Sequence, residues 1–195
     1  MKEKKAVLFL DNDGVIALSH NWGGRMKKWN KFKKLNPEVT TDMDAPADVR
    51  FDDFDKKAIK VLNQVLEETG TEIVVSSDWR LFATLEELGE YFLSQGIIKK
   101  PIDVTKRYIG CDKPDDFEWV RRTMIEQQRC IEVRQYLTDH PEVTHWACID
   151  DLQLGETDTQ GREQKWGLSN FVHTPRESEG IKQSGVKEKL LQHLK

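Results

Sequence analysis

The chain carries four short runs of residues in which apolar side chains dominate. They cover residues 6–10, 71–77, 144–149 and 169–173. Because these runs are largely apolar rather than alternating with polar residues, they are typical of strands that are covered on both faces of a sheet.

Four stretches with the spacing or end signals of helices lie between and after these runs. They fall within residues 52–70, 84–96, 115–139 and 184–194. In the first, the aspartate pair 52–53 supplies an N-cap, and Gly70 fits the position that ends a helix. The second opens with a capping box of Thr84 and Glu87. Alternating strands and helices predict an α/β fold, with one Rossmann-like, doubly wound parallel sheet in a single domain spanning 1–195.

Residues 17–50 have no clear place in this alternation, and we expect them to form a small flap or cap inserted after the first strand. Six of the ten residues from 25 to 34 are Lys or Arg, interleaved with Trp29 and Phe32, and an acidic stretch follows. One interpretation is a solvent-exposed insertion whose opposite charges pair with one another. The other is a flap over the active site that attracts an anionic substrate and stacks a base on an aromatic ring.

The composition narrows the class of protein. The chain has 30 Lys and Arg against 34 Asp and Glu, a net charge of −4, which argues against a general nucleic-acid coat but allows a local basic patch. Its three cysteines form no CxxC pair, which favours free thiols in a reducing compartment. No stretch resembles a secretory signal or a membrane span, so we expect a cytoplasmic protein without a membrane partner. The oligomeric state is left open.

Polar groups of similar chemistry end three of the four apolar runs. They are Asp11 and Asp13, Ser76 and Ser77, and Asp150 and Asp151. In open α/β sheets ligands bind just beyond the carboxyl ends of the strands, so these groups would converge on one crevice. At an effective dielectric of about 20, two like charges 4 Å apart repel by roughly 4 kcal/mol, so four carboxylates stay ionised only beside a cation. Hard oxygen ligands with room left for phosphate indicate Mg²⁺.

This arrangement predicts phosphate chemistry. A carboxylate can attack phosphorus to form an aspartyl phosphate, and a second carboxylate two residues on can protonate the leaving oxygen and later deprotonate water. Gly14 allows a sharp turn after these residues, so that backbone N–H groups can face the phosphoryl oxygens. Acidic loop residues that only cap helices or face water are the alternative interpretation.

Four motifs in order resemble the haloacid dehalogenase (HAD) superfamily of phosphohydrolases. They are "VLFLDNDGV", "IVVSSDWR", "QRCIEVRQYL" and "WACIDD". A tighter likeness, supported by "SSDWR" and the tail "FVHTPRESEGI", is to the small HAD domains associated with RNA repair proteins. A looser one is to the phosphatase half of polynucleotide kinase–phosphatase. The resemblance spans nearly the whole chain and covers residues 17–50 least.

The resemblance implies a role for each matched residue. Asp11 would be the nucleophile, Asp13 the general acid and base, and Ser76 the hydroxyl that hydrogen-bonds the phosphoryl group. The implied Mg²⁺ ligands are Asp11, Asp13 (also through its backbone carbonyl), Asp150 and Asp151. The candidates for substrate binding are Asn12, Gly14, Ser77 and Arg80.

The basic residue of the family pattern is the least determined. The family usually has Lys, and this chain offers Arg129, twenty-one residues before Asp150. Arg can hold a phosphoryl group bidentately, so we expect Arg129 to be catalytic. The alternatives are Lys113, Arg121, Arg122 and Lys165.

The sequence therefore predicts an enzyme, a Mg²⁺-dependent phosphomonoesterase that acts on a nucleotide or on the terminal phosphate of a nucleic acid. A phosphatase of non-nucleotide small molecules is one alternative. A HAD-fold binding or regulatory protein without turnover is another, although both Asp11 and Asp13 are intact. Trp79 is expected to serve packing rather than base stacking.

Overall fold

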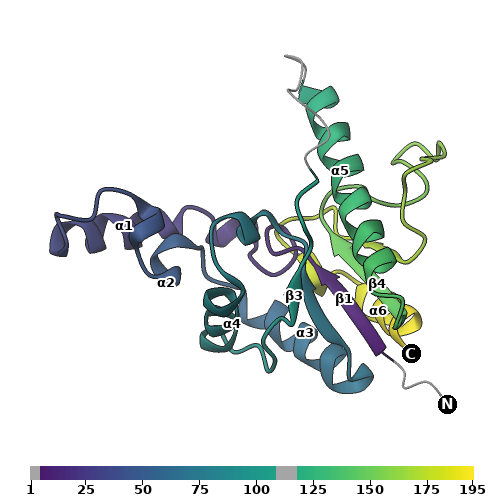
Figure 1. Ribbon diagram of the computed structural model, residues 1–195, viewed down its shortest axis with the longest axis horizontal. Helices are drawn as coiled ribbons and strands as arrows, with labels where there is room; N and C mark the ends of the chain where they lie inside the picture. The colour runs from purple at the N-terminus through teal and green to yellow at the C-terminus, as the bar shows by residue number, and fades with distance from the viewer. Residues whose placement is uncertain (1–4, 109–117) are drawn as a thin grey trace.

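A five-stranded, all-parallel sheet forms the centre of the computed structural model, which describes residues 5–108 and 118–195 except for the side chains of 118–123. The strand order is β3-β2-β1-β4-β5 (Figure 1). The strands are β1 (Lys5–Leu10), β2 (Glu72–Val75), β3 (Asp103–Val104), β4 (Val143–Asp150) and β5 (Phe171–His173). The predicted α/β sheet is confirmed. Strand β3, which pairs with β2 at the edge, was not predicted because its two residues are too few to give a pattern.

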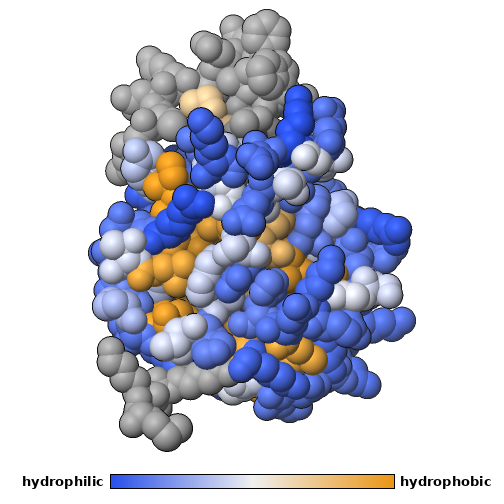
Figure 2. Space-filling model, turned by 90° about the vertical axis from the view of Figure 1, so that its right-hand side faces the viewer, coloured by the Kyte–Doolittle hydropathy of each residue, from blue (hydrophilic) through white to orange (hydrophobic). Residues whose placement is uncertain are grey.

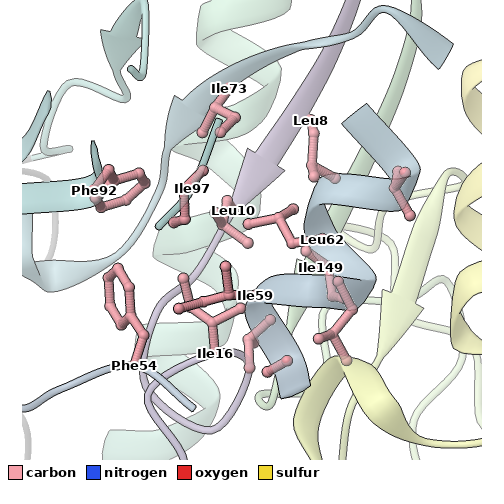
Figure 3. Packing of buried hydrophobic residues seen from close by; sticks show 14 of the residues in the cluster. Leu8, Leu10, Ile16, Phe54, Ile59, Leu62, Ile73, Phe92, Ile97 and Ile149 are labelled. Atoms are coloured by element: carbon pink, nitrogen blue, oxygen red, sulfur yellow. The ribbon is translucent and has the colours of Figure 1, made fainter. Parts of the chain in front are cut away.

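Helices cover both faces of the sheet, as the apolar runs predicted. Helices α3 (Lys56–Thr69), α4 (Leu85–Ser94) and α6 (Val186–Leu194) pack on one face, and α5 (Glu118–Asp139) on the other (Figure 1). Successive side chains of a strand point to opposite faces. Thus Leu8 and Leu10 enter the first core, where Leu62, Ile73 and Ile149 join them (Figure 3), while Val7 and Phe9 enter the second with Val133 of α5.

The ends of the helices follow local capping rules, with one difference from the prediction. Gly70 ends α3 at φ 67° and Thr84 forms the capping box of α4 with Glu87, as expected. The N-cap of α3 is Asp55, whose side chain accepts the N–H of Ala58, so the predicted capping by the pair 52–53 is wrong. Asp52 instead accepts hydrogen bonds from segment 23–25.

Residues 17–50 form short helices that extend to one side of the sheet (Figure 1). They are η1 (Ser19–Asn21), α1 (Gly24–Leu35), η2 (Asp42–Asp44) and α2 (Ala47–Arg50). Helix α1 has no buried residue, yet its start is held because the N–H groups of Gly23 and Arg25 donate to Asp52 at 3.2 and 2.7 Å. Lys28 pairs with Asp53 at 2.8 Å, which agrees with the interpretation that opposite charges pair here. The role of the segment as a flap stays a prediction.

The C-terminal part of the chain supports the loop that follows β1. The N–H of Ile181, in η4 (Gly180–Lys182), donates to the carbonyl of Val15 at 3.0 Å. Gly180 has φ +53°, and a Cβ there would lie 2.1 Å from the Val15 oxygen, so only glycine fits. Two distant parts of the sequence therefore share one rigid turn.

One face of the molecule shows how its apolar side chains reach the surface. The face in Figure 2 is largely hydrophilic, with apolar side chains showing between charged ones. Among the described residues, no helix has the length and apolarity that a bilayer crossing needs. Cys130 and Cys148 are buried, free thiols, and Cys111 lies outside the described residues.

Candidate active site

Three neighbouring strands bring their polar ends together at one edge of the sheet. Asp11 follows β1, Ser76 follows β2, and Asp150 ends β4. Because β1 lies between β2 and β4, these three positions are adjacent, as the sequence predicted. From β1 the chain connects to β2 and β3 on one side of the sheet and to β4 and β5 on the other. In α/β folds, ligands bind at the strand ends where the strand order changes direction in this way.

The carboxylates of Asp11, Asp150 and Asp151 form an acidic cluster. Each offers an oxygen within 4.8 Å of the others. Burial, together with the neighbouring Asp150, raises the pKa of Asp11 well above its ordinary value. Burial likewise raises the pKa of Asp150 and that of Asp151 to about 7 each. The folded protein therefore brings negative groups together at a free-energy cost that a bound cation would offset.

Arg129 joins this cluster from helix α5. Its Nη1 donates to Asp11 and to Asp150, both at 2.9 Å, and its Nη2 to Asp78 at 3.2 Å. Burial opposes the charge of Arg129, but Asp150 and Asp11 outweigh it and raise its pKa. Arg129 lies in the interior of α5 and not at its start, the position the family pattern suggests.

A second buried ion pair fixes α5 against the strand ends. Arg80 donates to Glu132 of α5 at 2.5 Å and to the carbonyl oxygens of Ser76, Ser77 and Thr105 at 2.6 to 3.0 Å. Glu132 is one helical turn beyond Arg129, so its ion pair with Arg80 helps to position Arg129 beside the acidic cluster. The side chain of Arg80 is 3% exposed. These protein groups hold its guanidinium, and its contact with substrate stays a prediction.

Asp13 lies apart from the acidic cluster and has a partner of its own. The indole N–H of Trp79 donates to a carboxylate oxygen of Asp13 at 2.8 Å. Burial raises the pKa of Asp13, while this hydrogen bond lowers it. Trp79 stacks between Phe51 and Phe54, with ring centroids 4.3 and 5.3 Å away. Its expected packing role is confirmed, whereas its hydrogen bond to Asp13 was missed. The indole that follows the serines in "SSDWR" was the only signal for it.

Several buried polar side chains at the strand ends have no hydrogen-bond partner among the described residues, and two of them lie beside Asp11 or at the end of β2. They are the Ser76 hydroxyl and the Asn12 amide, both fully buried. Buried polar atoms normally find a partner, so the Ser76 hydroxyl at the end of β2 is placed to bind a ligand oxygen. The Ser77 hydroxyl differs, because it caps η3 (Asp78–Leu81) by accepting the N–H of Trp79 at 3.4 Å.

Gly14 makes the turn that the sequence predicted. Its φ is +68°, and a Cβ would lie 2.7 to 2.9 Å from side-chain atoms of Asp151. Any side chain at this position would push Asp151 out of the acidic cluster. The N–H of Gly14 donates to the carbonyl of Ala17 at 3.0 Å and so does not face the site.

The structure places two of the basic candidates. Arg129 contacts the acidic cluster, and Lys165 is an exposed loop residue. Lys113 and the side chains of Arg121 and Arg122 lie outside the described residues.

Comparison with known proteins identifies the family. Residues 7–185 match the model of the HAD domain in Swiss Army Knife RNA repair proteins. The chain belongs to this family. No curated protein and no solved structure matches this HAD domain.

The residues of this HAD domain fit a divalent metal. When all three carboxylates are ionised, the acidic cluster and Arg129 carry three negative charges and one positive charge, a balance that one divalent cation neutralises. The cluster consists of carboxylate oxygens, which suit Mg²⁺ rather than a softer metal. Asp13 is not in the cluster, so its side chain stands apart from the other three predicted ligands.

Proposed function

We propose that this HAD domain is a Mg²⁺-dependent phosphomonoesterase that removes the terminal phosphate from a nucleotide or nucleic acid. The observation that carries the proposal is the meeting of the acidic cluster with the partnerless hydroxyl of Ser76. The family description supports the nucleic-acid class of substrate. Residues 17–50 would form a flap beside the site.

The proposed reaction has two steps, with Asp11 as the nucleophile. A carboxylate oxygen of Asp11 attacks phosphorus, the bond to the ester oxygen breaks, and Asp13 gives that oxygen a proton. Asp13 then takes a proton from water, whose oxygen attacks phosphorus, and inorganic phosphate leaves Asp11. The Ser76 hydroxyl would hold a phosphoryl oxygen during both steps.

Charge is the main obstacle to this reaction, because an anionic nucleophile must approach an anionic ester. Mg²⁺, held by the carboxylates of Asp11, Asp150 and Asp151, would supply positive charge beside the phosphoryl oxygens. Arg129 would reorient from Asp11 toward the phosphoryl group, since its planar guanidinium can bind two oxygens at once. Hydrogen bonds to Asp150 and Asp78 hold it within reach.

Phosphate release tests this proposal. We expect the protein with Mg²⁺ to hydrolyse a generic aryl phosphate and a 3′-phosphorylated oligonucleotide, and excess EDTA to abolish both activities. Asp11→Asn keeps the shape of the side chain but removes the nucleophile, so its kcat should fall at least about 1000-fold. An Asp11→Asn protein with wild-type activity would exclude the aspartyl phosphate, and inactivity on every phosphate ester would favour a binding protein.

A further inference from the structure

A pocket opens next to Asp13, outside the acidic cluster. Its volume is about 420 Å³, and its walls include Asp13, Trp22, Arg25, Met26, Phe51 and Trp79. This volume falls within the range of small-molecule sites. The walls come from the loop after β1, the start of α1 and the segments before α3 and within η3. The inserted segment thus completes a pocket that the sheet alone does not form.

The position of Asp13 determines which part of a substrate the pocket would take. If Asp13 protonates the leaving oxygen, the group attached to that oxygen must lie on the side of Asp13, away from the acidic cluster. The pocket lined by Asp13 is therefore the place for the leaving group. This assignment rests on the proposed function.

The walls of the pocket favour a planar, uncharged group. Trp22 is 42% exposed and its indole N–H donates to the carbonyl of Ala17 at 2.9 Å, so its ring is held in place with one part open to solvent. Phe51 and Trp79 are buried and stack on each other, leaving Trp22 as the exposed ring of the pocket. A base can stack on such a ring whatever its identity.

The charges of the pocket place anions at its rim and not inside. Asp52 also lines the pocket; the residue is 8% exposed, and its carboxylate accepts hydrogen bonds from the N–H groups of Gly23 and Arg25. A carboxylate at this position disfavours a second phosphate within the pocket. Arg25 is an exposed lining residue that makes no ion-pair contact among the described residues, although its charge acts on Asp13 and lowers the pKa of that carboxyl, so its guanidinium can also meet an anion from solvent.

Helix α1 continues the positive charge away from this rim. Lys27, Lys31 and Lys34 are exposed and share one face at spacings of four and three residues. We name this set the α1 lysine face. None of the three pairs with an acid within the described part of the chain, whereas Lys28 and Lys33 of the same helix bind Asp53 and the Val39 carbonyl. The positive charge that begins at Arg25 thus runs along the helix.

We infer that this pocket is the leaving-group subsite for the terminal nucleoside of a polynucleotide. Its base stacks on Trp22, the next phosphodiester binds Arg25, and the strand continues along the α1 lysine face. The substrate would then be a nucleic-acid strand end rather than a free nucleotide. Trp22 and Arg25 would determine specificity and take no part in bond cleavage.

Three 3′-phosphorylated substrates test the subsite by the ratios of their kcat/KM values. They are an oligonucleotide, the same oligonucleotide with an abasic terminal residue, and the nucleoside 3′-monophosphate of its terminal residue. We expect the wild-type protein to prefer the first substrate over each of the other two by about tenfold or more. Trp22→Ala should bring the ratio of base-bearing to abasic substrate close to one. Arg25→Gln should reduce the ratio of oligonucleotide to mononucleotide several-fold.

Ratios within one variant separate specificity from loss of fold, since partial unfolding lowers all rates together. Phe82→Ala is the matched control, because Phe82 is an aromatic residue of similar exposure, 48%, that does not line the pocket. Its ratios should equal those of the wild type. Unchanged ratios in Trp22→Ala would overturn the subsite while leaving the proposed phosphatase intact. Absence of hydrolysis of any ester by the wild type would overturn both.

Discussion

Two charged regions of this molecule differ in how their charges are held. In the acidic cluster, Arg129 lies between Asp11 and Asp150 with side chains at most 6% exposed. On the α1 lysine face, three like charges point into solvent without an acidic partner in the described structure. Buried charges interact strongly and are little affected by salt, whereas exposed charges are screened within about 10 Å at ordinary ionic strength. The first region is therefore suited to chemistry at fixed atoms, and the second to attracting a polyanion.

Replacing Arg129, the positively charged side chain of the acidic cluster, gives the largest expected effect on stability. Arg129→Met keeps most of the side-chain volume but leaves Asp11 and Asp150 without their shared partner. We expect the free energy of unfolding at pH 7.5 in EDTA to fall by about 3–5 kcal/mol, measured by urea denaturation. Added Mg²⁺ should recover part of the loss. A decrease below about 1 kcal/mol would mean that Arg129 is not coupled to these carboxylates.

The raised pKa values of the acidic cluster predict a pH-dependent response to Mg²⁺. For Asp150 and Asp151 the pKa in the folded protein is about 7, against an ordinary value of 3.8. The folded state then binds more protons than the unfolded chain, so these groups lower stability as the pH rises from about 4 to about 7. Mg²⁺ competes with those protons, and the rise in Tm that it causes should increase from pH 5 to pH 8 by several degrees.

Measurements at equal ionic strength with Na⁺ in place of Mg²⁺ provide the control. They are needed because other acids have lowered pKa values, Asp55 among them, and these acids raise stability as the pH rises. That contribution is the same with and without Mg²⁺, so the comparison removes it. Asp151→Asn should flatten the pH dependence of the Mg²⁺ effect. A rise in Tm that is the same at pH 5 and pH 8 would contradict a metal site in the acidic cluster.

Between the two regions lies the hydrogen bond from Trp79 to Asp13. Trp79→Phe preserves an aromatic ring beside Phe51 but removes the N–H donor. We expect kcat to fall about tenfold through loss of the orientation of Asp13, with a change in stability near 1 kcal/mol. Trp146→Phe, at a site on the opposite face of the sheet against Phe9, is the matched control and should retain its kcat. Equal kcat values for Trp79→Phe and the wild type would remove Trp79 from the mechanism.

Substitutions on the α1 lysine face should give the smallest effect on activity, and this effect should depend most strongly on salt concentration. Replacing Lys27, Lys31 and Lys34 by Gln should reduce kcat/KM for a long oligonucleotide a few-fold near 0.1 M salt. The slope of log kcat/KM against log salt should become shallower by up to about 0.7 for each phosphate that no longer meets a lysine. Activity on a mononucleotide should not change.

The matched control for this lysine variant is replacement of the exposed lysines Lys57, Lys60 and Lys189 on α3 and α6. It removes the same charge from other helices, so its salt dependence should equal that of the wild type. If both triple variants respond alike, the α1 lysine face acts only through net charge and does not contact the strand.

The sequence predicted the fold where one physical signal dominated. The apolar runs before Asp11 and Asp150 fixed two strands, and the capping box at Thr84 fixed the start of α4. The motif order also selected Arg129 among five basic residues. Strand β3 and the capping by Asp55 were beyond such reasoning, since a two-residue strand has no periodicity and several aspartates precede α3.

The contacts that sequence reasoning missed join segments far apart in the chain. The hydrogen bond from Trp79 to Asp13 spans 66 residues, and the pair of Arg80 with Glu132 spans 52. The place of Arg80 after the serines suggested a ligand for substrate phosphate, which stays a prediction, and the structure adds a contact with Glu132 that holds α5.

The contact between Gly180 and Val15 has a consequence for synthesis of the protein. The turn that carries Asp13 is translated before the segment that supports it, which lies 165 residues later in the chain. A nascent chain must therefore be extended beyond residue 181 before the N–H of Ile181 can bond the carbonyl of Val15, so this support of the turn forms after all five strands have been synthesised.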